Sequence, residues 1–340
     1  MTPRQRLTTT ETTPTAVKHH PFLPDRMKML ALALGLTTAA HAATYSAVSA
    51  VFTVDLRTSL PSRLVNVSTR GMVRPGEALT PGFVMTGPGR KQLVIRAIGP
   101  ALAGFGVAGA LSDTRLEVIR AGSTDAMMSN DNWGGTPALR DAFVAVGAFP
   151  LIATSLDAAV QATFPVDAYS VRTSPAGAAS SGIALAEVYD ADSDPTAAKL
   201  INVSTLGFVG TGANVLTAGF VIAGNLPMTL LIRAVGPGLS PFGVNERLAD
   251  PHLGVFSASP QTVVASNDNW GGTAVLKAVF AAAGAFVLPD TSRDAAMVVQ
   301  LQPGSYTAVV SGVGDTTGNA LVEVYDVATP PVEAAASTGR

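Results

Sequence analysis

The chain contains two copies of one sequence module. The segments LVNVST (64–69), LVIRAIGP (93–100), SNDNWGGT (129–136) and AEVYD (186–190) return as LINVST (200–205), LLIRAVGP (230–237), SNDNWGGT (266–273) and VEVYD (322–326). Equivalent residues are 136 or 137 positions apart. This period matches the size of an independent domain and far exceeds that of a solenoid or propeller unit. We therefore expect two tandem domains, 63–192 and 199–328, joined by a turn-rich linker.

Each copy is predicted to be built mainly from short β-strands. The candidates in the first copy are rich in Val, Ile, Leu and Thr and are bounded by Gly, Pro, Asn and Asp; they span 64–73, 80–86, 91–98, 115–120, 125–130, 156–164, 167–173 and 182–189. Short strands at regular spacing with turn signals are typical of a β-sandwich or barrel. The sequence therefore predicts an all-β protein made of two tandem, jelly-roll-like β-sandwich domains.

One short helix is expected in each copy. Thr136 followed by Pro137 fits an N-cap residue and a proline in the first helical position. Leu139, Phe143 and Val146 follow at helical spacing, and Gly147 can end the helix. The second copy repeats most of this plan from Thr273 to Gly284.

The N-terminal region reads as an export signal. Residues 27–42 (MKMLALALGLTTAAHA) combine a basic start, a short apolar run and an Ala-x-Ala cleavage site. The apolar run is too short to span a bilayer, which needs about 20 residues. We expect a signal peptide with a polar extension over 1–42, a linker over 43–62 and a disordered tail over 329–340. The expected location is the periplasm or the cell exterior, with no membrane span.

The repeated segments LVNVSTRG, LVIRAIGP, SNDNWGG, GAF, SLDAA and EVYD resemble a repeat found in uncharacterised secreted bacterial proteins. The C-terminal segment LQPGSYTAVVSG (301–312) is also distantly similar to β-sandwiches of the pre-peptidase C-terminal type. The first resemblance implies no assigned activity. The second implies an accessory binding or spacer role.

An arginine interrupts an equivalent apolar strand in each copy. A charge in such a strand normally needs a partner. We expect Arg96 to pair with Asp157 or Glu187, and Arg233 to pair with Asp294 or Glu323. These ion pairs would be structural.

The SNDNW loops offer a candidate metal site. The residues concerned are Asn130, Asp131, Asn132, Asn267, Asp268 and Asn269. Clustered Asn and Asp oxygens suit calcium, which takes about six to eight oxygen ligands. The alternative is a set of Asx turns in which these side chains bond to the local backbone. Calcium is the one cofactor that the sequence suggests, and the Asx-turn interpretation is favoured.

The tryptophans that follow these loops are candidate ligand-binding residues. Trp133 and Trp270 stand beside Gly-Gly pairs, where exposed indole rings could stack against sugar rings. The alternative, which is the commoner case for tryptophan, is burial in the core.

The sequence favours a protein without catalytic activity. It has no cysteine, no recognisable catalytic motif and, after residue 42, one histidine, His252, whose counterpart in the first copy is Arg115. A formal net charge of −2 does not favour a nucleic-acid partner. We expect a secreted binding or structural module whose partner is an extracellular polysaccharide or protein. The alternatives are a carbohydrate-binding protein, with or without calcium, and a secreted hydrolase that uses carboxylates such as Asp157 and Glu187.

Overall fold

The computed structural model describes residues 61–177, 180–192 and 198–327. The predicted signal peptide, most of the 43–62 linker and the predicted tail lie outside these residues. The described chain is mostly β, and its strands belong to one 16-stranded sheet system. The all-β prediction is therefore confirmed.

The strands of the first copy are β1 (Arg63–Val73), β2 (Thr80–Thr86), β3 (Arg90–Ile98), β4 (Thr114–Arg120), β5 (Ala126–Asn130), β6 (Ala158–Pro165), β7 (Ala168–Pro175) and β8 (Gly182–Asp190). Those of the second copy are β9 (Lys199–Val209), β10 (Leu216–Ala223), β11 (Met228–Val235), β12 (Pro251–Ala258), β13 (Gln261–Asn267), β14 (Ala295–Leu301), β15 (Gly304–Gly312) and β16 (Gly318–Asp326). The strands of the first copy differ from the predicted ones by no more than two residues at either end. Turn residues at the boundaries explain this agreement.

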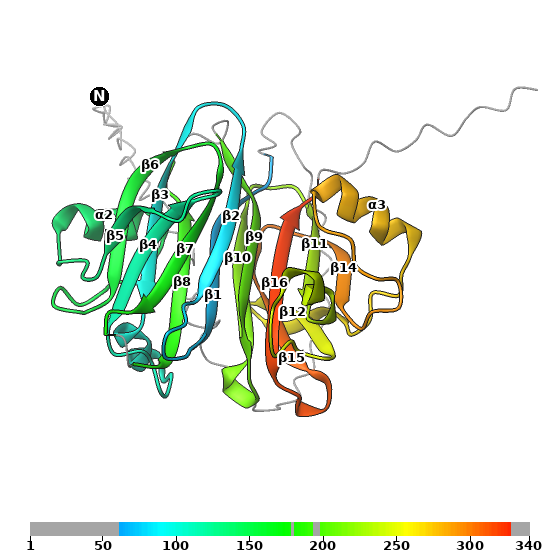
Figure 1. Cartoon of the computed structure of the whole chain (residues 1–340). Helices are drawn as coiled ribbons and strands as arrows, with labels where there is room; N and C mark the ends of the chain where they lie inside the picture. The colour runs from blue at the N-terminus through cyan, green and yellow to red at the C-terminus, as the bar shows by residue number, and fades with distance from the viewer. Residues whose placement is uncertain (1–60, 178–179, 193–197, 328–340) are drawn as a thin grey trace, which may run out of the picture.

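Hydrogen bonding orders the strands into two series. The first runs β6-β3-β8-β1-β10-β15-β12-β13, and the second runs β14-β11-β16-β9-β2-β7-β4-β5. Each series takes four strands from each copy. The copies meet where β1 pairs antiparallel with β10 and where β9 pairs antiparallel with β2. Figure 1 shows β1, β2, β9 and β10 in the middle of the molecule.

One hydrophobic core extends through both copies. It contains Leu64, Val67 and Phe83 of the first copy together with Leu200 and Phe220 of the second, all buried. Side chains of the two series meet across this core; for example, the rings of Phe164 on β6 and Tyr169 on β7 pack edge to face. Burying each large apolar side chain contributes about 1.5–3 kcal/mol. The prediction of two separate domains is not confirmed, because both series of strands and the core extend through both copies.

A helix covers a smaller apolar cluster in each copy, α2 (Pro137–Val146) in the first and α3 (Ala274–Ala283) in the second. The two helices lie on opposite flanks of the molecule (Figure 1). Thr136 is the N-cap of α2, with its side chain accepting a hydrogen bond from the Leu139 amide, as predicted. Gly147 follows the helix with φ of 69°, a left-handed conformation that favours glycine.

The short 3₁₀ helices η2 (Pro100–Phe105) and η4 (Pro237–Phe242) were not predicted. Each follows directly after the strand that carries the buried arginine, β3 or β11.

Candidate functional site

The most distinctive repeated feature is a buried polar cluster around Arg96. Its guanidinium Nη2 lies 2.6 Å from Glu187 Oε2, and both side chains are fully buried. Arg96 Nη1 also donates to the carbonyl oxygen of Phe149 at 2.7 Å. The Tyr189 hydroxyl donates to the other carboxylate oxygen of Glu187 at 2.8 Å. The Glu187 carboxylate therefore binds both the Arg96 guanidinium and the Tyr189 hydroxyl.

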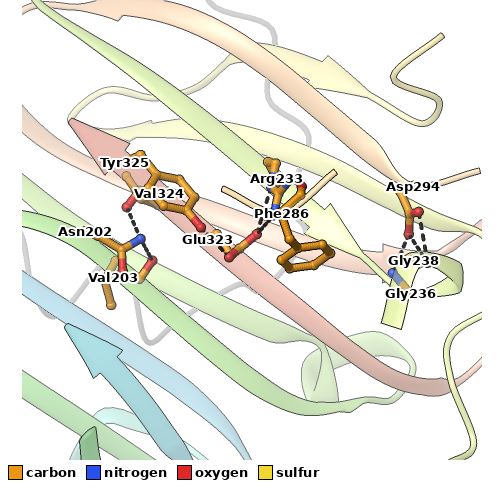
Figure 2. A network of polar contacts seen from close by, with 10 residues as sticks. All are labelled: Asn202, Val203, Arg233, Gly236, Gly238, Phe286, Asp294, Glu323, Val324 and Tyr325. Carbon is orange, nitrogen blue, oxygen red and sulfur yellow. Dashed lines mark hydrogen bonds and ion pairs between the residues drawn. The ribbon is translucent and has the colours of Figure 1, made fainter. Parts of the chain in front are cut away.

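The second copy repeats this arrangement. Arg233 Nη2 lies 2.5 Å from Glu323 Oε2, Arg233 Nη1 donates to the Phe286 carbonyl oxygen at 2.7 Å, and the Tyr325 hydroxyl donates to Glu323 at 2.5 Å. Figure 2 shows this chain of contacts running from Tyr325 through Glu323 to Arg233 and Phe286. Of the two carboxylates considered for each arginine, the glutamate is the partner. We refer to the two sets as the Arg–Glu–Tyr clusters.

Aromatic rings enclose the guanidinium groups. The Arg96 guanidinium carbon lies 4.2 Å from the ring centroid of Phe149 and 4.9 Å from that of Phe143. In the second copy the equivalent distances from Arg233 are 4.5 Å to Phe286 and 4.8 Å to Phe280. Cations at such distances are attracted by the electron-rich ring faces. The helices α2 and α3 contribute Phe143 and Phe280, so each cluster ties its helix to the sheet.

The electrostatics of the first cluster follow from its burial. Desolvation alone would lower the pKa of Arg96, but the surrounding groups Glu187, Tyr189 and Asp157 together outweigh it and raise the pKa. Burial, together with the negative charge of Glu187, raises the pKa of Tyr189 well above its usual value. Both residues therefore keep their protons throughout the ordinary pH range.

Asp157 and Asp294 have a different role from the one considered for them. Asp157 Oδ1 accepts from the Gly99 amide at 2.7 Å, and Asp157 Oδ2 accepts from the Ala101 amide at 3.2 Å. Asp294 accepts from the Gly236 and Gly238 amides at 2.7 and 3.0 Å (Figure 2). Each aspartate therefore satisfies amides at the start of η2 or η4, and neither is the arginine's partner.

The burial of Asp157 and Glu187 bears on the hydrolase alternative. Both residues are fully buried, at 0% exposure. Their oxygens are engaged with backbone amides and with Arg96, respectively. A carboxylate needs contact with substrate to act on it, and in this structure both carboxylates are covered by protein.

The SNDNW loops use their first asparagine internally. Asn130 Oδ1 accepts from the Ala159 amide at 3.0 Å, and Asn130 Nδ2 donates to the Asn132 carbonyl oxygen at 2.9 Å. Asn267 makes the equivalent bonds to Ala296 and Asn269. Asp131, Asn132, Asp268 and Asn269 are exposed. Of these bonds, the ones to Asn132 and Asn269 hold the local backbone, as the Asx-turn interpretation expects. The bonds to Ala159 and Ala296 instead tie the loop to strands β6 and β14.

Both tryptophans lie in the core. Trp133 and Trp270 are each 2% exposed, and their indole Nε1 groups donate to the carbonyl oxygens of Ile152 and Pro289. Each ring packs against the helix phenylalanine, Phe143 or Phe280. The ring faces are covered by protein, so the interpretation of Trp133 and Trp270 as sugar-stacking platforms is wrong.

Lys91 is a buried charged residue that the sequence pattern did not single out. Lys91 is 1% exposed, and its Nζ lies 2.9 Å from Asp190 Oδ1 and 3.2 Å from Asp192 Oδ2. Burial raises the pKa of Asp190, although Lys91 opposes the shift. Methionine replaces this lysine at position 228 of the second copy. The available signal was a lysine near the start of a mainly apolar strand, β3.

Within residues 61–177, 180–192 and 198–327, no group of three or more His, Asp or Glu side chains is placed to hold a metal ion. No helix in the same part of the chain combines the length and apolarity needed to cross a membrane.

Comparison with known proteins identifies no family. No protein-family model matches the chain, and no curated protein matches it. Among solved structures, a DUF4785 family protein from Legionella pneumophila subsp. pneumophila aligns with 84% of this chain and 89% of its own. The identity is 7% and the TM-score is 0.17, a similarity too low to carry an argument about fold or function.

Proposed function

We propose that this protein is a secreted, non-catalytic β-repeat protein that acts as an extracellular binding or structural module. One observation carries the proposal: the repeated polar residues that lie in or beside the core use their side chains inside the fold. The Arg–Glu–Tyr clusters, the aspartates that hold η2 and η4, and Asn130 and Asn267 all bond internally. The repeated features therefore support a scaffold rather than a reaction centre.

We further propose that each copy is a jelly-roll-like sandwich of two four-stranded sheets. One sheet would be the four strands that the copy contributes to the first series, and the other would be the four that it contributes to the second. The first copy would contribute β6-β3-β8-β1 as one half and β2-β7-β4-β5 as the other. This arrangement supports a presenting role, because rigid strands position the exposed loops that usually carry binding residues. The proposed partner is an extracellular polysaccharide or protein, and the proposed location is the periplasm or cell exterior.

A retention assay tests the proposal. Purified residues 43–340 would be passed over a panel of insoluble polysaccharides and immobilised extracellular proteins, with calcium and with a chelator, and the same panel would be assayed for hydrolysis products. Selective retention without product formation is expected. Release of products, lost in Asp157→Asn and Glu187→Gln variants that remain folded, would contradict the non-catalytic proposal. Absence of retention on every surface would contradict the binding role and leave a purely structural one.

The Trp133→Phe/Trp270→Phe variant is the matched control for retention. Because both indoles are buried, retention by the folded variant should equal that of the unsubstituted protein. Loss of polysaccharide retention in a variant with native circular dichroism would restore the carbohydrate-stacking interpretation.

A further inference from the structure

We propose that the module has a built-in recognition surface, formed by its two inner edge strands, and that the partner of this surface is a second copy of the same module. The inner edges are β1 and β2 in the first copy and β9 and β10 in the second. In this chain the two copies recognise each other, and their association does not require the covalent connection between them. This inference is independent of which ligand or surface the protein binds.

The hydrogen-bonding pattern is reciprocal. Residues Arg63–Arg70 of β1 pair with Thr217–Ala223 of β10, and residues Lys199–Leu206 of β9 pair with Thr80–Thr86 of β2. In both pairings the first strand of one copy, β1 or β9, pairs with the second strand of the other copy, β10 or β2. A lone copy would leave both strands as open edges, and open edges are templates for pairing with another chain.

The residues that face each other at these edges are the same in both pairings. Asn66-Val67-Ser68 lies opposite Gly219-Phe220-Val221, and Asn202-Val203-Ser204 lies opposite Gly82-Phe83-Val84. Both pairings also contain a register shift beside the asparagine. The two edges of one module are therefore complementary to the edges of another module of the same sequence.

A serine and a glycine fit together at the centre of each pairing. A Cβ atom on Gly219 would lie 2.6 Å from Ser68 Oγ, and a Cβ atom on Gly82 would lie 3.1 Å from Ser204 Oγ. Glycine leaves the space that the opposite hydroxyl group occupies. Any larger residue at either glycine would need the serine side chain or the strands to shift.

The asparagines anchor the edges to the body of their own copies. Asn66 Nδ2 donates to the Val188 carbonyl oxygen on β8, and Asn202 Nδ2 donates to the Val324 carbonyl oxygen on β16, at 3.3 and 3.2 Å. Figure 2 shows the second of these bonds. Because these bonds lie within each copy, they hold each edge strand in place for the other copy.

The two copies also meet through equivalent positions, among them Leu64 with Leu200 and Thr69 with Thr205. Thr69 Oγ1 and Thr205 Oγ1 lie 2.6 Å apart and are both buried, and these residues are 136 positions apart, which is the repeat offset. Strands β1 and β9 run parallel beside each other at this point. Contact between equivalent residues marks an approximate two-fold axis, as expected for a self-complementary interface.

Cleavage between the copies tests the proposal on the whole chain. A protease recognition sequence would replace residues 193–197, and the purified protein would be cut to completion. The cut protein should elute from a size-exclusion column at the volume of the uncut protein, with unchanged circular dichroism. Elution as two smaller species that each retain β-sheet circular dichroism would overturn the proposal.

A glycine variant tests the proposed edge contacts in the cut protein. Gly82→Val/Gly219→Val places side chains against both serines, whereas Gly104→Val adds the same side chain where no atom lies within 4 Å. Overpacking of this kind should weaken the association of the two fragments by roughly tenfold or more. Gly104→Val should leave the association unchanged. Equal dissociation curves for the two folded variants would overturn the assignment of the edges. If the double variant does not fold, the cut protein without substitutions decides.

Discussion

The buried arginine of each copy illustrates how a charge can be accommodated in an apolar strand. Arg233 is fully buried, and it reaches one carboxylate, one carbonyl oxygen and two phenylalanine rings. Neutralisation of a buried charge by a carboxylate does not guarantee net stabilisation, because both groups lose their hydration. The pair contributes mainly to specificity, because any fold that buries one of the two charges without the other has a higher free energy.

Removing one member of the Arg233–Glu323 pair should therefore cost more than removing both. Arg233→Met leaves Glu323 buried without its cation, which should lower the free energy of unfolding by about 3–5 kcal/mol. Arg233→Met/Glu323→Leu should lose less. Urea unfolding of Arg233→Met, Glu323→Leu and the double variant measures the difference.

The control for this cycle is the exposed pair of Lys277 and Asp290, whose side chains are 41% and 60% exposed. Lys277→Met should change the free energy of unfolding by less than about 1 kcal/mol. If Arg233→Met were no more destabilising than Lys277→Met, the assigned role of the buried pair would be wrong.

The cluster tyrosines predict a loss of stability at alkaline pH. Burial, reinforced by Glu187 and Glu323, raises the pKa of Tyr189 and Tyr325 above the usual value of 10.0. Above about pH 10 the unfolded chain loses these protons while the folded chain keeps them. The unfolded state then binds fewer protons, so the free energy of unfolding falls as pH rises.

Urea unfolding between neutral and alkaline pH measures this decline. Tyr189→Phe/Tyr325→Phe should be less stable at neutral pH, because two buried hydrogen bonds are lost, but its stability should fall less steeply above pH 10. The slope will not vanish, since burial also raises the pKa of Tyr169 and Tyr306. An unchanged slope in the double variant would contradict the assignment.

At the scale of elements, the sequence predicted the local structure, namely the ends of helices and strands. Thr136, Pro137 and Gly147 marked the helix ends because capping chemistry is local in sequence. The sequence did not decide whether Asp157 or Glu187 pairs with Arg96. Asp157 instead binds amides at the start of η2, and no sequence pattern predicted that helix. Strand positions could be predicted, but the pairing of β1 with β10 could not, because alternating residues define the faces of a strand and not its neighbour.

The N-cap of α2 supports a prediction at this scale. Thr136→Ala removes the side-chain acceptor for the Leu139 amide and should cost about 1 kcal/mol. Thr136→Ser keeps the hydroxyl and should restore most of this loss. Equal destabilisation by alanine and serine, measured by urea unfolding, would show that Thr136 does not act through the cap.

At the scale of the whole molecule, the two copies share their strand series and one hydrophobic core. Each series of strands passes through both copies, and residues such as Val67 and Phe220 lie in a core that both copies share. Separation of the copies would break the β1–β10 and β9–β2 pairings and expose this core. The sequence defines the two copies and their offset, but the size of a repeat does not reveal whether its edge strands face water or the other copy.

Differential scanning calorimetry of residues 43–340 tests this central claim most directly. If the copies share their sheets and core, they should unfold in one transition, with a calorimetric enthalpy equal to the van't Hoff enthalpy. Two independent sandwiches would give two transitions, or a calorimetric enthalpy about twice the van't Hoff value. The single transition is the predicted result, and two separable transitions would contradict the account.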